Sequence, residues 1–226
     1  MDDKILIIED DADIRRLLSK VLEAQGYGTE TARNGLDGLS RALEGDFSLI
    51  VLDLMLPLKT GEEVLRALRE AKATPVIVLS AKNMVHDRIE LLRLGADDYI
   101  TKPFDIDELA LRVGAVLRRT RPQVGAGSRL CFQDITMDTD AKRVYVGTAE
   151  VVLTAMEYAI LELLLKNPRQ IFSKARLFTA VCGETYISGD NTIHVHMSNI
   201  RKKLGAVSDG EYIETVYGMG YRLVQP

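Results

Sequence analysis

The run LIVLDLMLP, residues 49–57, constrains the fold more than any other stretch of this chain. Its first four residues are apolar, a length typical of a strand that is buried on both faces of a parallel sheet. Asp53 then lies at the carboxyl end of that strand, where open α/β sheets bind their ligands. A carboxylate in this position costs desolvation unless a cation or hydrogen-bond donors meet it. Asp53 could instead simply cap the next helix. The residues at the ends of the neighbouring strands distinguish between a ligand site and a helix cap.

The first half of the chain alternates strand-like and helical segments. Strands are expected near residues 4–8, 27–31, 49–53, 75–80 and 99–100. Apolar residues at helical spacing follow each run, as Ile14, Leu18 and Leu22 do after the first. Five strands alternating with five helices predict an α/β doubly wound five-stranded parallel sheet.

Polar residues stand at the ends of four of these strands. They are Glu9 and Asp10 after the first, Asp53 at the third, Ser80 at the fourth and Lys102 after the fifth. Carboxyl ends of parallel strands meet at one edge, so these groups should converge there. Three clustered carboxylates repel one another unless a hard cation such as Mg2+ neutralises them. An aspartate beside such an ion, with an ammonium and a hydroxyl nearby, is suited to accept a phosphoryl group.

The motifs IIEDD, LDLMLP, VLSAK and GADDYITKPF, in this order, resemble the receiver domain of response regulators over about residues 3–119. The resemblance implies the flavodoxin-like strand order 2-1-3-4-5 and makes Asp53 the phospho-acceptor. It also implies that Mg2+ is held by Glu9, Asp10, Asp53 and the main-chain carbonyl of Met55. Lys102, before a cis proline, would then be the partner of the phosphoryl group.

The same resemblance assigns a switch and a pairing surface to the receiver. Ser80 would be the switch hydroxyl, at a position where this subfamily more often has threonine, and Tyr99 the aromatic residue whose rotamer reports it. Charged residues would form the dimer interface, with Arg88 facing Glu108 and Asp98 facing Arg112 across a two-fold axis. The full interface set is Arg88, Asp97, Asp98, Glu108 and Arg112.

Residues 118–128, RRTRPQVGAGS, are polar and rich in glycine, which predicts a flexible tether. We therefore expect a first domain at 1–119, a linker at 120–128 and a second domain at 129–226. The second domain begins with short strand-like runs near 130–132, 135–137, 143–146 and 151–153, followed by three helical segments from Thr154 onwards. A hairpin, with strands at 211–216 and 221–224, closes it. This order predicts an α+β winged helix-turn-helix whose last helix enters the major groove of DNA.

The third of these helices, near residues 191–204, has two faces. Ile193, Met197, Ile200 and Leu204 recur at helical spacing and should pack inward. The residues expected to point outward are His194, Val195, Ser198, Arg201 and Lys202, with Asn199 and Lys203 beside them. For an isolated helix such a face would simply be solvated, and the hairpin that follows is what favours DNA contact instead.

The motifs LTAMEY, NPRQIFSKARL, NTIHVHMSNIRKKLG and IETVYGMGYRL resemble the OmpR/PhoB-type effector domain over about residues 129–226. The resemblance implies transcriptional control and head-to-tail DNA binding. The expected DNA-binding residues are His194, Val195, Ser198, Asn199, Arg201, Lys202, Tyr217 and Arg222. His194 stands where the family usually has aspartate, Asn191 where it has arginine, and Tyr217 where the wing offers an arginine. These departures bear on the DNA sequence that is bound, while the fold is unaffected.

Composition excludes several classes of protein. Hydrophobic residues make up 46% and charged residues 27% of the chain, which is ordinary for a soluble globular protein. The net charge of −4 arises in residues 1–127, which hold 18 Lys and Arg against 22 Asp and Glu, and this argues against a wholly basic nucleic-acid coat protein. Cys131 and Cys182 are too few for a disulfide framework. Both are expected to be reduced thiols of a cytoplasmic protein. No signal-peptide or membrane-spanning pattern is present.

Both resemblances lead to one expectation: a phosphorylation-activated transcriptional regulator of a two-component system, and not an enzyme. A sensor histidine kinase would phosphorylate Asp53, the protein would form a homodimer, and DNA half-sites and RNA polymerase would be its further partners. The alternative from the enzyme class is a phosphatase with an aspartyl nucleophile, which would need a second acid or base that Met55 and Lys82 do not supply. A regulator that works without phosphorylation is a third possibility, which the complete set of Glu9, Asp10, Asp53 and Lys102 disfavours.

Overall fold

The structure is a computed structural model that describes residues 3–81, 85–120, 129–182 and 192–224, without the side chains of residues 85–88, 119–120 and 182. The chain divides into two compact units, Met1–Arg118 and Arg119–Pro226, which are described separately below. The expected linker at 120–128 falls outside the described residues except for Thr120, which ends a helix. None of the helices described is both long and apolar enough to cross a membrane.

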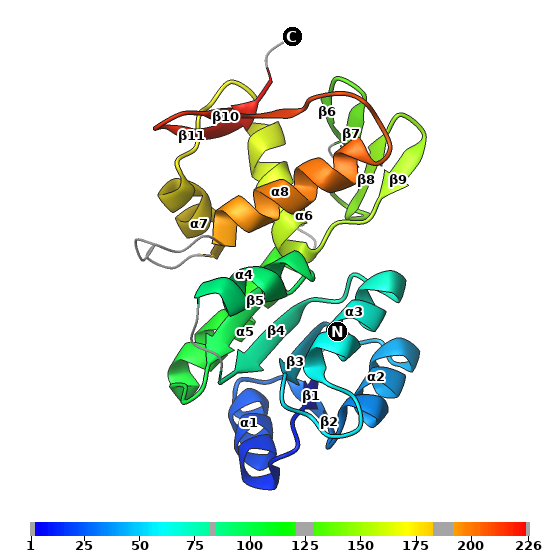
Figure 1. The fold of residues 1–226 in the computed structure, drawn as a ribbon, viewed down its shortest axis with the longest axis vertical. Coiled ribbons are helices and arrows are strands. Elements are labelled where there is room, and N and C mark those ends of the chain that lie inside the picture. Colours follow the sequence, from blue (N-terminus) through cyan, green and yellow to red (C-terminus); the bar gives the residue numbers. More distant parts are fainter. Residues whose placement is uncertain (1–2, 82–84, 121–128, 183–191, 225–226) are drawn as a thin grey trace. The chain divides into compact units, whose positions relative to one another are not determined.

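The first unit is a five-stranded parallel sheet covered by helices on both faces (Figure 1). Its strands are β1 (Lys4–Ile8), β2 (Gly28–Ala32), β3 (Leu49–Asp53), β4 (Val76–Ser80) and β5 (Asp98–Thr101). Its helices are α1 (Ala12–Ala24), α2 (Gly35–Glu44), α3 (Gly61–Ala71), α4 (Val85–Arg93) and α5 (Ile106–Thr120). The strand order is β2-β1-β3-β4-β5, which confirms the predicted doubly wound fold.

Packing on both faces holds the central strand β3 in place. All five of its residues are buried. Ile50 and Leu52 belong to the core on the side of α2, α3 and α4, whereas Leu49 and Val51 belong to the core on the side of α1 and α5. Each such side chain contributes roughly 1.5–3 kcal/mol by leaving water. The strand is therefore fixed along its length, and Asp53 is fixed at its end.

The connection from β3 to α3 turns back sharply beside Asp53. Thr60 and Glu63 form a capping box that begins α3. The amide of Gly61 donates to the carbonyl oxygen of Leu54 at 3.0 Å. A Cβ atom at Gly61 would lie 2.2 Å from the main-chain oxygen of Asp53, closer than any real Cβ contact. A side chain at this position would thus push α3 away from the strand end.

The second unit is a four-stranded antiparallel sheet followed by three helices and a hairpin (Figure 1). The sheet contains β6 (Arg129–Phe132), β7 (Ile135–Asp138), β8 (Arg143–Val146) and β9 (Ala149–Val151) in sequence order. The helices are α6 (Ala155–Lys166), α7 (Lys174–Cys182) and α8 (Thr192–Gly205), and the hairpin is β10 (Ile213–Val216) with β11 (Gly220–Leu223). This arrangement confirms the predicted winged helix-turn-helix.

One strand begins earlier than predicted. The last strand of the sheet was expected at 151–153, but β9 is Ala149–Val151. Val146 pairs with Ala149, so only two residues connect β8 to β9, and Gly147 has a φ of 58°. Two-residue hairpin turns favour residues with positive φ, and this tight turn sets the register of β9. Leu153 and Thr154 are then left to begin α6, where Thr154 forms a capping box with Glu157.

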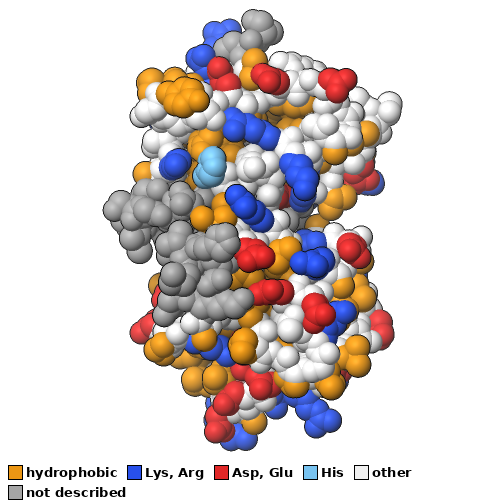
Figure 2. Space-filling view, viewed as in Figure 1, with side chains coloured by type: hydrophobic (Ala, Val, Ile, Leu, Met, Phe, Trp, Pro, Cys, Tyr) orange, Lys and Arg blue, Asp and Glu red, His pale blue; other side chains and the backbone are white. Residues whose placement is uncertain are grey.

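The hairpin is joined to the body of the second unit through Phe172. The amide of Phe172 donates to the carbonyl oxygen of Tyr221 at 2.8 Å, and the amide of Tyr221 donates back at 2.9 Å. Gly220 permits this approach, because a Cβ there would lie 2.0 Å from the Phe172 oxygen. Lys and Arg side chains and a histidine side chain are exposed on the face over which α8 runs (Figure 2).

Candidate functional site

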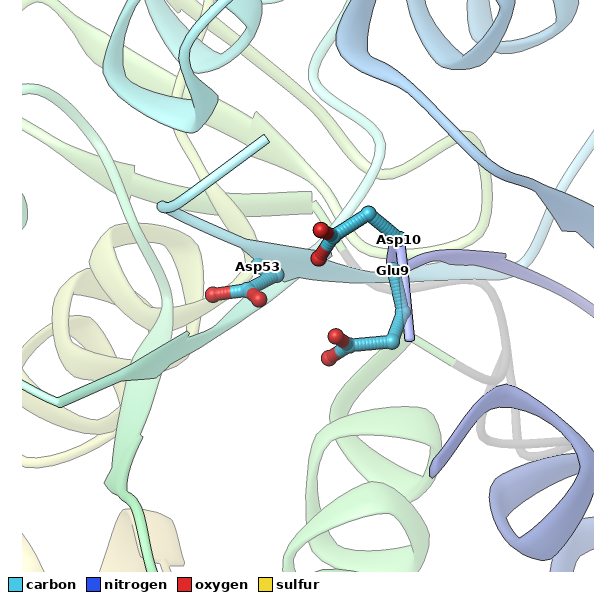
Figure 3. A group of neighbouring side chains, drawn as sticks. All are labelled: Glu9, Asp10 and Asp53. Atoms are coloured by element: carbon cyan, nitrogen blue, oxygen red, sulfur yellow. The ribbon is translucent and has the colours of Figure 1, made fainter. Parts of the chain in front are cut away.

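Three carboxylates converge at the carboxyl edge of the parallel sheet. Glu9 and Asp10 follow β1, Asp53 ends β3, and the side chains point toward one another (Figure 3). One oxygen from each lies within 4.8 Å of the others. Glu9 and Asp53 are 1% and 3% exposed, whereas Asp10 is exposed. Hard carboxylate oxygens with one side open to water suit Mg2+, which keeps part of its hydration shell, so the residues fit the predicted ion.

Lys102 joins two of these carboxylates. Its Nζ lies 2.7 Å from Oδ2 of Asp53 and 2.8 Å from Oε2 of Glu9. The Lys102-Pro103 peptide bond is cis, as predicted. The second carboxylate oxygen of Asp53, Oδ1, accepts a hydrogen bond of 3.2 Å from the amide of Met55. Asp53 is therefore held from two directions, by an ammonium and by a main-chain amide.

The cluster shifts the proton affinities of its members. Burial raises the pKa of Glu9 to about 7, the hydrogen bond from Lys102 opposes this rise, and the charge of Asp53 reinforces it. Burial lowers the pKa of Lys102, but the hydrogen bonds to Asp53 and Glu9 outweigh burial and leave that pKa raised. Lys102 thus stays charged at neutral pH, while a divalent cation at this site would compete with a proton for Glu9.

Ser80 ends β4 at the same edge and is buried. Strand β4 lies beside β3, with Leu79 paired to Asp53. The main-chain oxygen of Ser80 accepts a hydrogen bond of 2.7 Å from the amide of Lys102. Tyr99 lies on β5 and is half-buried. The structure thus places Ser80 at the same sheet edge as the acidic cluster, whereas the switch roles of Ser80 and Tyr99 stay predictions.

Arg15 is a further contributor that the sequence did not suggest. Its guanidinium donates to the main-chain oxygens of Glu9 and Asp10 at 2.6 and 2.9 Å. It lies on α1, whose first turn is capped by Asp11. Arg15 therefore fixes the loop that presents both acidic residues. The available signal was an arginine on the first helical turns after the acidic pair, which is too common a pattern to carry a prediction.

The expected dimer residues do not all lie at the surface. Asp97 is fully buried, and its Oδ2 accepts from Arg69 at 2.9 Å and from the amide of Val76 at 3.0 Å. Arg69 also donates to the main-chain oxygen of Gly95 at 2.8 Å. The interface assignment of Asp97 is therefore wrong, because this carboxylate serves an internal ion pair that links α3 to β4 and the start of β5.

Arg112 already has partners inside one receiver. Its guanidinium lies 2.9 Å from Asp98 and 2.9 Å from Glu108. The sequence-based expectation placed Asp98 and Arg112 on opposite protomers, so any pairing across a two-fold axis has to compete with these contacts. The side chain of Arg88 lies outside the described residues.

On α8 the inward face is confirmed. Ile193, Met197, Ile200 and Leu204 all belong to the core of the second unit. His194, Ser198 and Lys202 are exposed as expected, and Asn199 and Lys203 are half-buried. Lys203 pairs at 2.6 Å with the fully buried Glu157, which also caps α6.

Val195 departs from the expected pattern. Its place in the helical repeat is opposite the inward residues, and it is not part of the core cluster, yet it is only 2% exposed. Val195 is thus covered rather than exposed, although it lies outside the core cluster, and its contact with DNA stays a prediction. Contact with a thymine methyl group would first require this side chain to be uncovered.

The two arginines expected to contact DNA both make bonds within the domain. Arg201 donates from Nε to the carbonyl oxygen of Ile213 at 3.1 Å and from its terminal nitrogen to Oγ1 of Thr215 at 2.9 Å. Its guanidinium lies 5.7 Å from the ring centre of Tyr221. Arg222 pairs with Glu214 across the hairpin. Arg201 therefore connects α8 to β10 in this structure, and its contact with DNA stays a prediction.

Tyr217 lies at the tip of the hairpin, between β10 and the turn at Gly218. Its side chain is 95% exposed, and the neighbouring Met219 is 57% exposed. The tip thus presents its side chains to solvent, as a wing that reaches a DNA groove has to do. Contact with DNA stays a prediction for this residue.

Comparisons with known proteins agree for both units. Residues 5–114 match the response regulator receiver domain, and residues 148–223 match the C-terminal domain of transcriptional regulatory proteins. The transcriptional regulatory protein ResD of Bacillus subtilis is 39% identical, over 97% of this chain and 95% of its own. The response regulator ArlR of Staphylococcus aureus is also 39% identical, over 96% and 98%. YkoG of Bacillus subtilis, an uncharacterized transcriptional regulatory protein, is 39% identical over 97% of both chains.

Solved structures show the same architecture. DrrB, an OmpR/PhoB homologue of Thermotoga maritima, is 28% identical over the whole of both chains, with a TM-score of 0.54. A mutant of the protein RitR shares the fold with a TM-score of 0.80, over 99% of this chain and 100% of its own, at 24% identity. The two domain matches and the relatives of 39% identity favour the regulator over the phosphatase that the sequence left open. The chain belongs to the OmpR/PhoB-type response regulators of two-component systems, in which a receiver is joined to a DNA-binding effector domain that regulates transcription.

Proposed function

We propose that this protein is a transcriptional regulator switched on by phosphorylation of Asp53. A sensor histidine kinase donates the phosphoryl group, receivers then pair as a homodimer, and the effector domains bind paired DNA half-sites. The observation that carries the proposal is the position of Lys102, whose ammonium lies within 2.8 Å of both Asp53 and Glu9. Cytoplasmic location and contact with RNA polymerase follow from this role as parts of the proposal.

The chemistry requires little from the protein beyond placement and charge. An oxygen of Asp53 attacks the phosphorus, and the P–N bond to the kinase imidazole breaks as the new P–O bond forms. The imidazole nitrogen keeps the electron pair of the broken bond. Glu9, Asp10, Asp53 and the main-chain carbonyl of Met55 would hold Mg2+, which when bound supplies positive charge to the transferring oxygens. Lys102 supplies a second positive charge from the end of another strand.

Lys102 also provides the link from chemistry to switching. In the unphosphorylated receiver its ammonium is shared between two carboxylates. A phosphoryl group on Asp53 offers Lys102 new anionic oxygens in place of the aspartate oxygen, and the adjacent Ser80 can donate its hydroxyl to them. The edge formed by β4 and β5 would rearrange in response. β5 also carries Asp98, at its amino end, and Asp98 is bonded to Arg112 of α5.

The proposal is tested with acetyl phosphate as donor and intact-mass spectrometry as readout. Wild-type protein with Mg2+ should gain one phosphoryl group, and Asp53→Asn should gain none, because the amide lacks the nucleophilic oxygen. Asp13→Asn is the matched control, since Asp13 lies on the exposed side of α1 and its loss should change nothing. Asp10→Asn should react more slowly, by weakening the metal site. Undiminished phosphorylation of Asp53→Asn would contradict the assignment.

A further inference from the structure

A groove separates α8 from the hairpin in the second unit. It encloses about 530 Å3 and is lined by Ser173, Lys174, Ala175, His194 and residues 215–221. Its walls come from the beginning of α7, the exposed side of α8 and the hairpin. Positively charged side chains and a histidine side chain gather on this face of the unit (Figure 2).

The position of this groove suits the sugar-phosphate strand that separates the major groove of DNA from the adjacent minor groove. If the proposed function holds, α8 lies in a major groove and the hairpin reaches the adjacent minor groove. One sugar-phosphate strand separates a major groove from the minor groove beside it. That strand has to pass between the two elements, and the groove lies between them. Its natural occupant is therefore a phosphodiester of bound DNA.

The charges that line the groove suit an anion. Among the described residues of its lining, only Lys174 and His194 can carry a positive charge, and none is acidic. The guanidinium of Arg201 lies over the ring of Tyr221 and is bonded to β10, and Arg222 is paired with Glu214. These two arginines are thus engaged elsewhere. An aspartate at position 194, which the family usually has, would repel a phosphate here.

Tyr221 controls how His194 presents its ring. The Tyr221 hydroxyl lies 3.1 Å from Nδ1 of His194, and Tyr221 itself is 2% exposed and bonded through its main chain to Phe172. When the hydroxyl donates to Nδ1, the neutral imidazole carries its hydrogen on Nε2. His194 is exposed, so Nε2 is left to donate to a ligand in the groove.

We infer that His194 and Lys174 bind one DNA phosphate, with Tyr221 as the positioning residue that orients the imidazole. The inference rests on the proposed function and specifies how this chain contacts the DNA backbone. Lys174 contributes a fixed charge. His194 donates a hydrogen bond from Nε2 when neutral, and a protonated imidazole would add a positive charge to the same contact.

The test measures DNA affinity of the full-length, phosphodonor-treated protein against pH and salt, on one DNA fragment recovered by binding selection. Contact with a phosphate that raises the pKa of a histidine from about 6.5 by about one unit tightens wild-type binding roughly sixfold between about pH 8 and about pH 6. His194→Gln keeps a neutral donor, so it should match wild type within about twofold at the higher pH and lose the gain in acid. Tyr221→Phe should weaken DNA binding at the higher pH but keep the increase in affinity on going to the lower pH.

Lys174→Gln tests the other wall of the groove. It should lower the slope of log affinity against log salt by about 0.9, the value of one phosphate contact. Lys166→Gln is the matched control, because Lys166 lies on α6 outside the groove and pairs with Glu162. Equal pH dependence of wild type and His194→Gln, or equal salt slopes of the two lysine variants, would overturn the inference while DNA binding persists. If the wild-type protein binds no DNA, the proposed function itself fails.

Discussion

The acidic edge of the receiver and the α8–hairpin face of the effector domain differ in how far water reaches their charged and polar side chains. In the receiver, Glu9 and Asp53 are nearly inaccessible, and Lys102 is bonded to both. On the effector face, His194, Lys202 and Tyr217 are exposed. Electrostatic interactions are strong where water is excluded and weak where it is not. Under the proposed function, the receiver edge therefore carries out its reaction where water is largely excluded, whereas the effector face has to gain its affinity for DNA from several contacts that are each weak.

The same contrast separates structural charges from binding charges. The Arg69–Asp97 pair of the receiver is internal, and Arg201 of the effector domain is bonded to its own hairpin. Both Asp97 and Arg201 are therefore engaged within the molecule, although their charges suggested an intermolecular role. A charged residue near a functional surface has to be assigned by its partners, because the charge alone does not distinguish binding from architecture.

The largest effect is expected from the buried receiver pair. Arg69→Ala leaves Asp97 as an uncompensated buried carboxylate, which should cost about 3–5 kcal/mol of unfolding free energy. Arg66→Ala on the same helix, at an exposed position, should cost far less. Urea denaturation followed by circular dichroism measures both. Equal urea midpoints for the two variants would contradict the expectation that the buried ion pair contributes more to stability than the exposed charge.

Arg201 provides the next test, now in the effector domain. Arg201→Ala removes the bonds from α8 to Ile213 and Thr215, and should weaken DNA binding by roughly ten- to a hundredfold, or about 1.4–2.8 kcal/mol. Arg201→Lys separates two explanations, since lysine keeps the charge but cannot form the forked contacts. Binding as weak as that of the alanine variant would indicate positioning. Recovery of most of the affinity in a titration of the lysine variant would instead show that the charge contacts DNA.

A smaller effect is expected from Arg112 and Asp98, whose side chains are 19% and 13% exposed. Ion pairs that water still reaches are worth about 1 kcal/mol or less. Arg112→Glu should weaken phosphorylation-dependent dimerisation, and adding Asp98→Arg should partly restore it. Because these residues also pair within one protomer, the restored double variant does not show which pairing matters. A mixture of Arg112→Glu and Asp98→Arg proteins does, since only pairing across the two-fold axis is restored in a mixed dimer. Sedimentation that shows no preferred mixed dimer would exclude the intermolecular pair.

The smallest effect is expected at the hairpin tip. Tyr217→Arg adds a cation suited to a narrow, A·T-rich minor groove. It should tighten binding to A·T-rich flanks and steepen the salt dependence by about 0.9, one phosphate equivalent. Salt titrations of wild type and variant on one site measure this difference. An unchanged slope with unchanged flank preference would mean that the tip does not reach the minor groove.

Much of the fold and the receiver site followed from local sequence patterns. A run of apolar residues ended by Asp53, Glu9-Asp10 or Ser80 predicts a buried strand with a polar end, and parallel pairing brings such ends together. The inward face of α8 followed in the same way from its 3.6-residue repeat. These predictions succeed because the backbone itself determines where successive side chains point.

What only the tertiary structure decided is which partner each charged side chain takes. Lys102 and Glu9 are 93 residues apart, Arg69 and Asp97 are 28 apart, and Arg201 reaches a hairpin strand that follows its own helix. The Tyr221 hydroxyl lies within hydrogen-bond distance of His194, 27 residues away in the sequence, and Val195 is buried although its repeat position is outward. Periodicity determines the direction of a side chain, but the packing of distant elements determines what it meets, because long polar side chains bond to whatever group the fold brings within reach.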